Sequence, residues 1–177
     1  MEKLCEFALS KKGKAVTVIS GVLTAVICLV MNFVLIPKIE STTNGVRCFD
    51  MNFAYGYATA KKFLELLSQE GKQIYLGVQL PLDFVYPIVY TVFFIFILIR
   101  LTKKANLLIV PPIILAVLDY TENVLSIVML KADTLSKSVA AFGSVVTSVK
   151  TVLMYLIFLI IIISFILWLK NRKKLKA

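Results

Sequence analysis

The stretch "TVLMYLIFLIIIISFILWL" at residues 151–169 decides the fold class, because its 19 residues carry no charge. About 20 apolar residues in a helix cross the hydrocarbon core of a bilayer, and three further apolar segments precede this one in the chain. Their lengths are helical, and helices satisfy their own backbone hydrogen bonds in lipid. We therefore predict an all-α, four-transmembrane-helix bundle. It forms a single membrane domain, 1–177, with spans at about 15–36, 80–101, 106–130 and 150–169.

The amino-acid composition agrees with this prediction and disfavours several classes of enzyme and metal site. The chain is 59% hydrophobic, which leaves no room in 177 residues for a large soluble catalytic domain. It has no histidine, the commonest metal ligand and neutral-pH base. Its three cysteines are far apart and form no CxxC, and the redox state of Cys48 stays open. We expect no metal and no cofactor, and whether the protein is an enzyme is undecided by the sequence.

The distribution of lysine and arginine predicts the orientation. The first apolar segment is too long for a signal-peptide core, so we interpret it as a retained span. Twelve cations lie in the N-terminal tail, the link between spans two and three, and the C-terminal tail, whereas seven lie in the other, longer loops. By the positive-inside rule both termini are cytoplasmic, in a multi-pass protein of the plasma membrane. The net charge of +10 then suits the anionic lipids of the bilayer and not a nucleic acid.

The extracytoplasmic loop between spans one and two, 37–79, is the only sizeable soluble part. Its segment "TAKKFLELLSQEG" (59–71) has Ala60, Phe63, Leu64 and Leu67 at helical spacing. We predict a short amphipathic helix that ends at Gly71. This helix either caps the bundle or forms a lid over a site.

Polar residues interrupt all four spans, and those of the last three give our candidate site. Asp119, Glu122 and Asn123 form one stripe on the third helix, at i, i+3 and i+4. Counted at 1.5 Å per residue from the cytoplasmic end, the polar positions lie about 18–28 Å up, in the outer half of a core about 30 Å thick. The predicted ligand-binding residues are Asp83, Tyr86, Tyr90, Asp119, Glu122, Asn123, Lys150 and Tyr155.

Three carboxyl groups in this predicted pocket face a single lysine. Carboxylates crowded at low dielectric cannot all stay ionised, so either one of them holds a proton or a cation lies among them. Intramembrane ionisable residues face a bundle interior or a wet cavity and are functional candidates. Such residues can also simply bond helices to one another in lipid.

Four short motifs carry a resemblance: "FDMNFAYGY", "LLSQEGKQIY", "LDFVYPIVY" and "LDYTEN", between residues 49 and 123. This series resembles a family of uncharacterised bacterial four-span membrane proteins. The resemblance implies the topology and implies no activity. It highlights Asp83, Tyr86, Pro87, Asp119, Glu122 and Asn123. In layout alone, the chain is also similar to the four-span sterol-isomerase and sigma-2-receptor type of bundle, which holds amine-bearing or sterol ligands.

Three functions follow as hypotheses. The first is binding or transport of a cation, a proton or an amine-bearing, lipophilic small molecule, with carboxyl protonation coupled to binding. The second is a membrane enzyme that acts on a lipid at the outer leaflet, with a carboxyl group as general acid or base. The third is a structural, immunity or accessory protein without a ligand. The sequence leaves oligomer formation open.

Overall fold

The computed structural model describes residues 1–174, which fold almost entirely as helices with no strand among them. Four helices are long and apolar enough to cross a membrane. The predicted all-α class is thereby confirmed, together with four helices long and apolar enough to span a membrane.

Three of the four long helices extend well beyond the predicted apolar spans, because their polar ends continue the same helix, and the third matches its predicted span to within one residue. The first comprises α2 (Lys11–Val30), the π-helical η1 (Met31–Leu35) and α3 (Ile36–Ser41). The second comprises α5 (Gln69–Ile74), the π-helical η3 (Tyr75–Gln79) and α6 (Leu80–Thr102). The third consists of the short 3-10 helix η4 (Leu107–Ile109) and α7 (Val110–Lys131), and the fourth is α8 (Lys137–Lys174).

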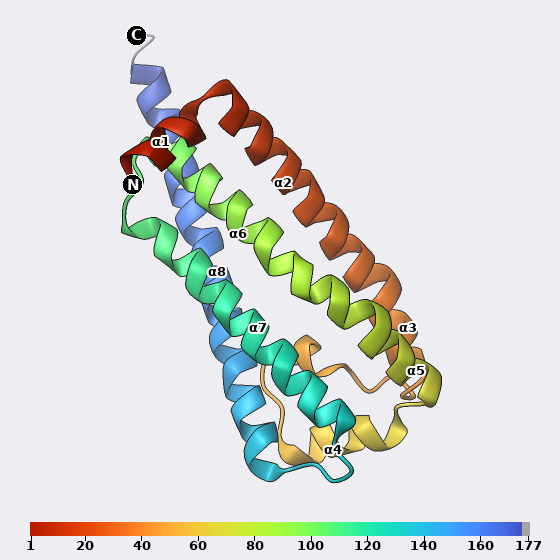
Figure 1. Cartoon of the computed structure of the whole chain (residues 1–177). Coiled ribbons are helices and arrows are strands. Elements are labelled where there is room, and N and C mark those ends of the chain that lie inside the picture. Colours follow the sequence, from red (N-terminus) through yellow and green to blue (C-terminus); the bar gives the residue numbers. More distant parts are fainter. Residues whose placement is uncertain (175–177) are drawn as a thin grey trace.

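The four long helices run side by side with alternating directions (Figure 1). Helix α2 packs on α6, α6 packs on α7, and α7 packs on α8. Helix α1 (Glu2–Leu9), the α6–α7 connection and the C-terminal part of α8 lie together at what we call the terminal end. The connection 42–68 lies at the opposite, loop end, with the α7–α8 connection 132–136.

Helix α1 was absent from our sequence prediction, which treated residues 1–14 as a tail. It packs on the terminal end of α6, where Ala8 is buried with Phe96 and Ile99. The Arg100 guanidinium donates a 2.7 Å hydrogen bond to the Ala8 carbonyl oxygen. Helix α2 begins directly afterwards because the Ser10 hydroxyl accepts from the Gly13 N–H at 3.0 Å.

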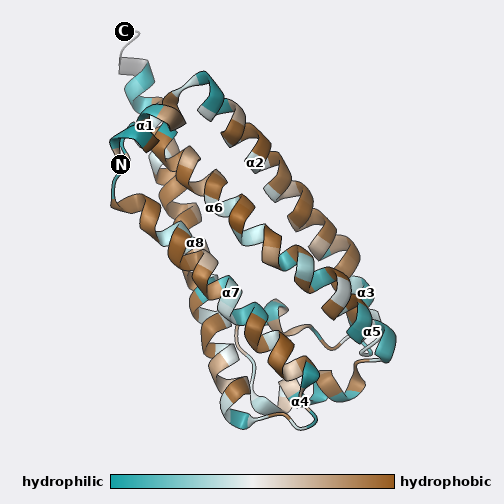
Figure 2. Ribbon diagram, in the orientation of Figure 1, coloured by the Kyte–Doolittle hydropathy of each residue, from teal (hydrophilic) through white to brown (hydrophobic). Residues whose placement is uncertain are grey.

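The exterior of the long helices is apolar between two polar ends (Figure 2). Helices α2 and α8 leave most of their apolar side chains exposed, including Val22, Leu29, Phe158 and Ile162. Soluble proteins rarely expose apolar patches of this extent. These surfaces are suited to contact with lipid.

The loop end is closed by a layer of aromatic side chains. Helix α4 (Tyr57–Leu66) buries Ala60 and Phe63, and Phe63 packs against Phe49 with ring centroids 4.8 Å apart. The predicted helix end at Gly71 is wrong, because the Ser68 hydroxyl accepts from the Gly71 N–H at 3.0 Å and thereby starts α5. Gly71 is needed there because a Cβ would collide with the Thr42 side chain.

The segment before α4 docks on α8 through backbone groups. The Tyr55 N–H donates to the Ser144 hydroxyl at 2.8 Å, and the Ser148 hydroxyl donates to the Phe53 carbonyl oxygen at 2.8 Å. The Tyr55 hydroxyl lies where a Cβ on Gly143 would be. These contacts explain why α8 begins at Lys137, well before the predicted start of the span at residue 150: its first turns support the loop.

We predict that Gly143→Ala destabilises the protein, because the new methyl group displaces the Tyr55 hydroxyl. Overpacking of this kind costs about 1–3 kcal/mol, which should lower the melting temperature of the detergent-purified protein. Adding Tyr55→Phe should restore stability, since it removes the colliding oxygen. Gly77→Ala, at a helical position with open space around it, is the matched control and should not destabilise. A Gly143→Ala variant that melts like the parent would show that the loop does not dock this way.

Candidate functional site

An ion triad joins α7 to α8 in the half of the bundle nearer the loop end. The Lys150 ammonium lies between two carboxylates, 2.9 Å from Asp119 Oδ1 and in contact with Glu122 Oε2. Both acids are buried, with 6% of Asp119 and 2% of Glu122 exposed. Lys150 is the only cation paired with these acids among the residues that the structure describes.

Helical spacing explains how these groups meet. Asp119 and Glu122 are three residues apart on α7, so they share one face. Thr147 and Lys150 are three residues apart on α8 and share the face that packs on α7. Both of these α8 side chains reach Glu122.

Two neutral groups complete the hydrogen bonding of the acids. The Tyr90 hydroxyl of α6 donates to Asp119 Oδ2, and the Thr147 hydroxyl donates to Glu122 Oε1. All four carboxylate oxygens of the triad therefore have a partner. This arrangement allows two ionised carboxylates to remain buried, because charge is tolerated in an interior only where it is paired and hydrogen-bonded.

Two more carboxyl groups lie close to the triad without a cation of their own. Asp83 of α6 is 8% exposed, and Asp50 comes from the loop helix η2 (Phe49–Met51). Neither forms an ion pair within the described part of the chain. The Tyr75 hydroxyl approaches Asp50 Oδ1 at 3.4 Å. Burial raises the pKa of Asp50 from 3.8 to about 6, the Glu122 charge adds to this rise, and the Lys150 charge opposes it.

The Tyr55 phenol marks the boundary between the loop and the triad. Burial raises its pKa to about 12, and the Glu122 charge acts in the same direction. Burial also raises the pKa of the Cys48 thiol in this loop, and all three cysteines are free. Tyr55 and Cys48 of this loop therefore stay neutral at physiological pH.

Gln79 is the one buried side chain whose amide lacks partners among the described residues. It is 1% exposed, and neither Oε1 nor Nε2 is hydrogen-bonded to protein. Gln79 is four residues after Tyr75, the partner of Asp50, and four residues before Asp83. It therefore lies along the helix between Asp83 and the tyrosine that contacts Asp50. An unpaired buried amide costs about 1–3 kcal/mol, so such a group normally holds a water or a ligand.

The structure brings together most, but not all, of the predicted site residues. Tyr86 packs edge-on against Tyr90 with ring centroids 5.1 Å apart. Asn123 donates to the Asp83 carbonyl oxygen at 2.9 Å and so ties α7 to α6. Tyr155 is 65% exposed on the outside of α8 and does not join the cluster. The physical reason is the direction around the helix axis, because five residues from Lys150 correspond to about 140° around the helix.

Our sequence reasoning missed four members of the site: Asp50, Tyr75, Gln79 and Thr147. The first three fall in the segment predicted to be an outer loop, and loop conformation has no periodic pattern to read. Thr147 was accessible from the sequence, because it precedes Lys150 by three residues and shares its helical face.

The Lys150 side chain lies at the centre of the acidic cluster, between Asp119 and Glu122. Two cavities of the described chain have volumes of about 340 and 480 Å³, and neither is lined by an acidic residue. No group of three or more His, Cys, Asp or Glu within residues 1–174 is placed to hold a metal ion.

Comparison with known proteins adds no relative. No protein-family model matches the chain, and neither a curated protein nor a solved structure matches it. The resemblance of its motifs to a four-span bacterial family therefore stays a prediction.

We predict that Lys150→Met destabilises the protein by about 3–5 kcal/mol near neutral pH, because two buried carboxylates lose their counter-charge. The loss should shrink as the pH falls, since protonation removes the same charges. Thermal unfolding in detergent between pH 4 and 8 measures both effects. Adding Glu122→Gln should recover part of the stability. Lys61→Met, at an exposed lysine paired with Glu65, is the control. Equal melting of Lys150→Met and the parent at every pH would contradict the triad.

Asp50 gives a second prediction, on pH dependence. Its pKa is about 6 in the folded protein against 3.8 ordinarily, so the folded state binds the proton more tightly. This contribution to stability is complete below about pH 4 and is lost as the pH rises through about 6. Asp50→Asn should therefore raise the melting temperature relative to the parent above pH 6 and not below pH 4. Asp133→Asn, at an exposed acid of the α7–α8 connection, should not show this pH-dependent rise in melting temperature.

Proposed function

We propose that this is a multi-pass protein of the plasma membrane with its terminal end in the cytoplasm. Two observations support this topology. The exterior of the four long helices is apolar. The N-terminal lysines, Arg100, Lys103 and Lys104 gather at the terminal end, as the positive-inside rule requires of a cytoplasmic face.

We infer that the charged centre binds protons and exchanges them for a small amine-bearing cation. The observation that carries this proposal is the charge balance: four carboxyl groups, Asp50, Asp83, Asp119 and Glu122, gather around the one ammonium of Lys150. Uncompensated carboxylates are too costly in a low-dielectric interior, so the excess acids hold protons until a cation replaces them.

The residues around the charged centre provide an acid, aromatic rings and a hydrogen-bond acceptor for a bound amine. Lys150 illustrates that an ammonium group fits between these carboxylates. Asp83 has no cation of its own and is the natural partner for a ligand amine. Tyr86 and Tyr90 lie one and two turns along the same helix, with their rings packed edge to face, and aromatic rings attract cations. The free Gln79 carbonyl oxygen accepts an N–H of the bound amine.

The test measures binding and proton release together. Detergent-purified protein in weak buffer is titrated with octylamine and with tetrabutylammonium, while an indicator dye reports pH and a parallel thermal scan reports stabilisation. We predict that octylamine raises the melting temperature and releases about one proton per bound amine near pH 6. Asp83→Asn should abolish the proton release and weaken binding about ten-fold or more, the size of a lost charged hydrogen bond. Asp133→Asn is the control.

A structural role is the alternative that a specific observation favours. Three interhelical hydrogen bonds hold α6 to α7: Asn123 to the Asp83 carbonyl oxygen, Tyr120 to the Phe84 carbonyl oxygen, and Thr91 to the Pro112 carbonyl oxygen. If the polar residues serve only this purpose, neither amine stabilises the parent at any pH. Asp83→Asn then leaves these hydrogen bonds in place, because Asp83 takes part through its backbone carbonyl oxygen. A lipid-modifying enzyme would instead keep ligand binding in Asp83→Asn and lose turnover.

A further inference from the structure

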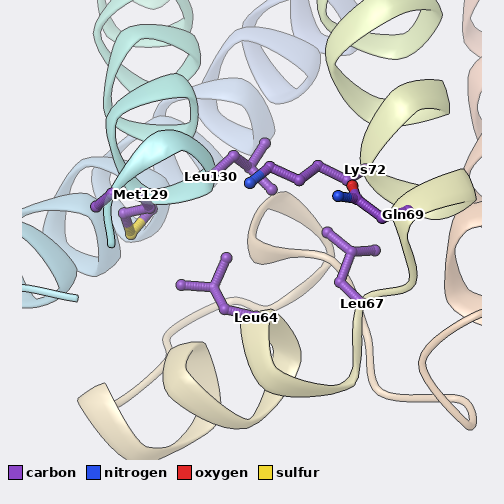
Figure 3. A pocket seen from close by; sticks show the side chains of 7 residues that line it. Leu64, Leu67, Gln69, Lys72, Met129 and Leu130 are labelled. Atoms are coloured by element: carbon purple, nitrogen blue, oxygen red, sulfur yellow. The ribbon is translucent and has the colours of Figure 1, made fainter. Parts of the chain in front are cut away.

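A cavity with a different chemistry lies at the loop end, away from the acidic centre. Its volume is about 340 Å³, and it lies between α4, the start of α5 and the end of α7 (Figure 3). Leu64 and Leu67 come from α4 and the residue following it, and Met129 and Leu130 come from the last turn of α7. These four side chains give the cavity apolar walls, and the exposed Ala132 lies at its edge.

Polar groups line only one side of this cavity. Gln69 and Lys72 both belong to α5. Figure 3 shows the Lys72 side chain reaching across toward Leu130, with Gln69 beside its stem. A concave apolar surface with a few polar groups on one side is the usual form of a small-molecule site. Its chemistry fits an amphiphile with one polar head.

The charge of this side identifies the head group. Lys72 forms no ion pair within the described chain. Two other lysines of the loop end have partners: Lys61 pairs with Glu65 at 3.5 Å, and Lys137 lies over the Tyr57 ring at 5.7 Å. An ammonium that lies at an apolar cavity without a carboxylate is complementary to an anion, and a phosphate group is a common partner of lysine.

The position of the cavity identifies the source of the ligand. Helix α7 ends at Lys131 and α5 begins at Gln69, so the cavity lies where the polar loop end meets the apolar part of the bundle (Figure 2). In the proposed topology this level coincides with the head groups of the outer leaflet. A phospholipid there can place its phosphate and an acyl chain at the cavity at the same time.

We propose that this cavity binds an anionic phospholipid of the outer leaflet, with its phosphate on Lys72 and Gln69 and an acyl chain against Leu64, Leu67, Met129 and Leu130. The site is distinct from the acidic centre, and none of the four acids lines it. The bound lipid joins α4 to α5 and α7, and so it stabilises the closed loop end over the charged residues.

The test compares lipids on the delipidated, detergent-purified full chain. Phosphatidylglycerol, phosphatidylcholine and inorganic phosphate are titrated, with thermal shift and native mass spectrometry as readouts. We expect phosphatidylglycerol to raise the melting temperature and to stay bound in the gas phase, phosphatidylcholine to bind at least ten-fold more weakly, and inorganic phosphate to have no effect. Lys72→Gln should reduce phosphatidylglycerol affinity about ten-fold. Ala132→Phe, which fills the cavity edge from an exposed position, should reduce binding of both lipids.

Two control variants show whether the lipid response belongs to this cavity. Lys62→Gln removes an exposed lysine of α4 that does not line the cavity, and it should leave lipid binding unchanged. Asp83→Asn should also keep the full phosphatidylglycerol response, so failure of the proton-exchange proposal would not affect this one. Equal binding of the two lipids, or an undiminished phosphatidylglycerol response in Lys72→Gln, would overturn the proposal. A response to inorganic phosphate equal to that of the lipid would also overturn it.

Discussion

The ion triad of Asp119, Lys150 and Glu122 is the constraint on which the arrangement of this bundle depends. Apolar packing between helices in lipid tolerates sliding and rotation, because every face is similarly apolar. One ammonium that must reach two carboxylates is far less tolerant. It fixes how far α8 is shifted along α7 and which faces of the two helices meet. Tyr90 of α6 donates to the same triad, so α6 is held by the same requirement.

The closed loop end follows from the same constraint. Once α8 is positioned by Lys150, its preceding turns present Gly143, Ser144 and Ser148 to the segment before α4. The Ser144 hydroxyl accepts from the backbone of that segment, and the Ser148 hydroxyl donates to it. The docked segment in turn brings Asp50 next to the charges that Lys150 pairs. The backbone of the segment before α4, Gly143 and Lys150 therefore hold the loop end closed together. The segment lies far from the other two in the sequence.

The four long helices and part of the site could be predicted from the sequence. The remaining site residues could not, for physical reasons. Apolar length alone identifies the four long helices, since the bilayer sets that length. Spacing and depth identify Asp119, Glu122 and Lys150, because both are properties of one regular helix. Depth does not give the direction around a helix axis, so Tyr155 was placed in the cluster although it lies outside. Asp50 and Gln79 depend on a loop fold and a π-helical turn, neither of which leaves a periodic pattern.

The charge balance of the centre explains why such a structure would respond to protons. A triad with two acids and one base carries a net negative charge even when fully hydrogen-bonded. Any further ionised carboxylate nearby adds repulsion that the single Lys150 charge offsets only in part. Asp83 and Asp50 occupy this position, and the unpaired amide of Gln79 lies beside the first of them. A proton, a water or a ligand could supply the missing partners, and this is the basis of the proposed exchange.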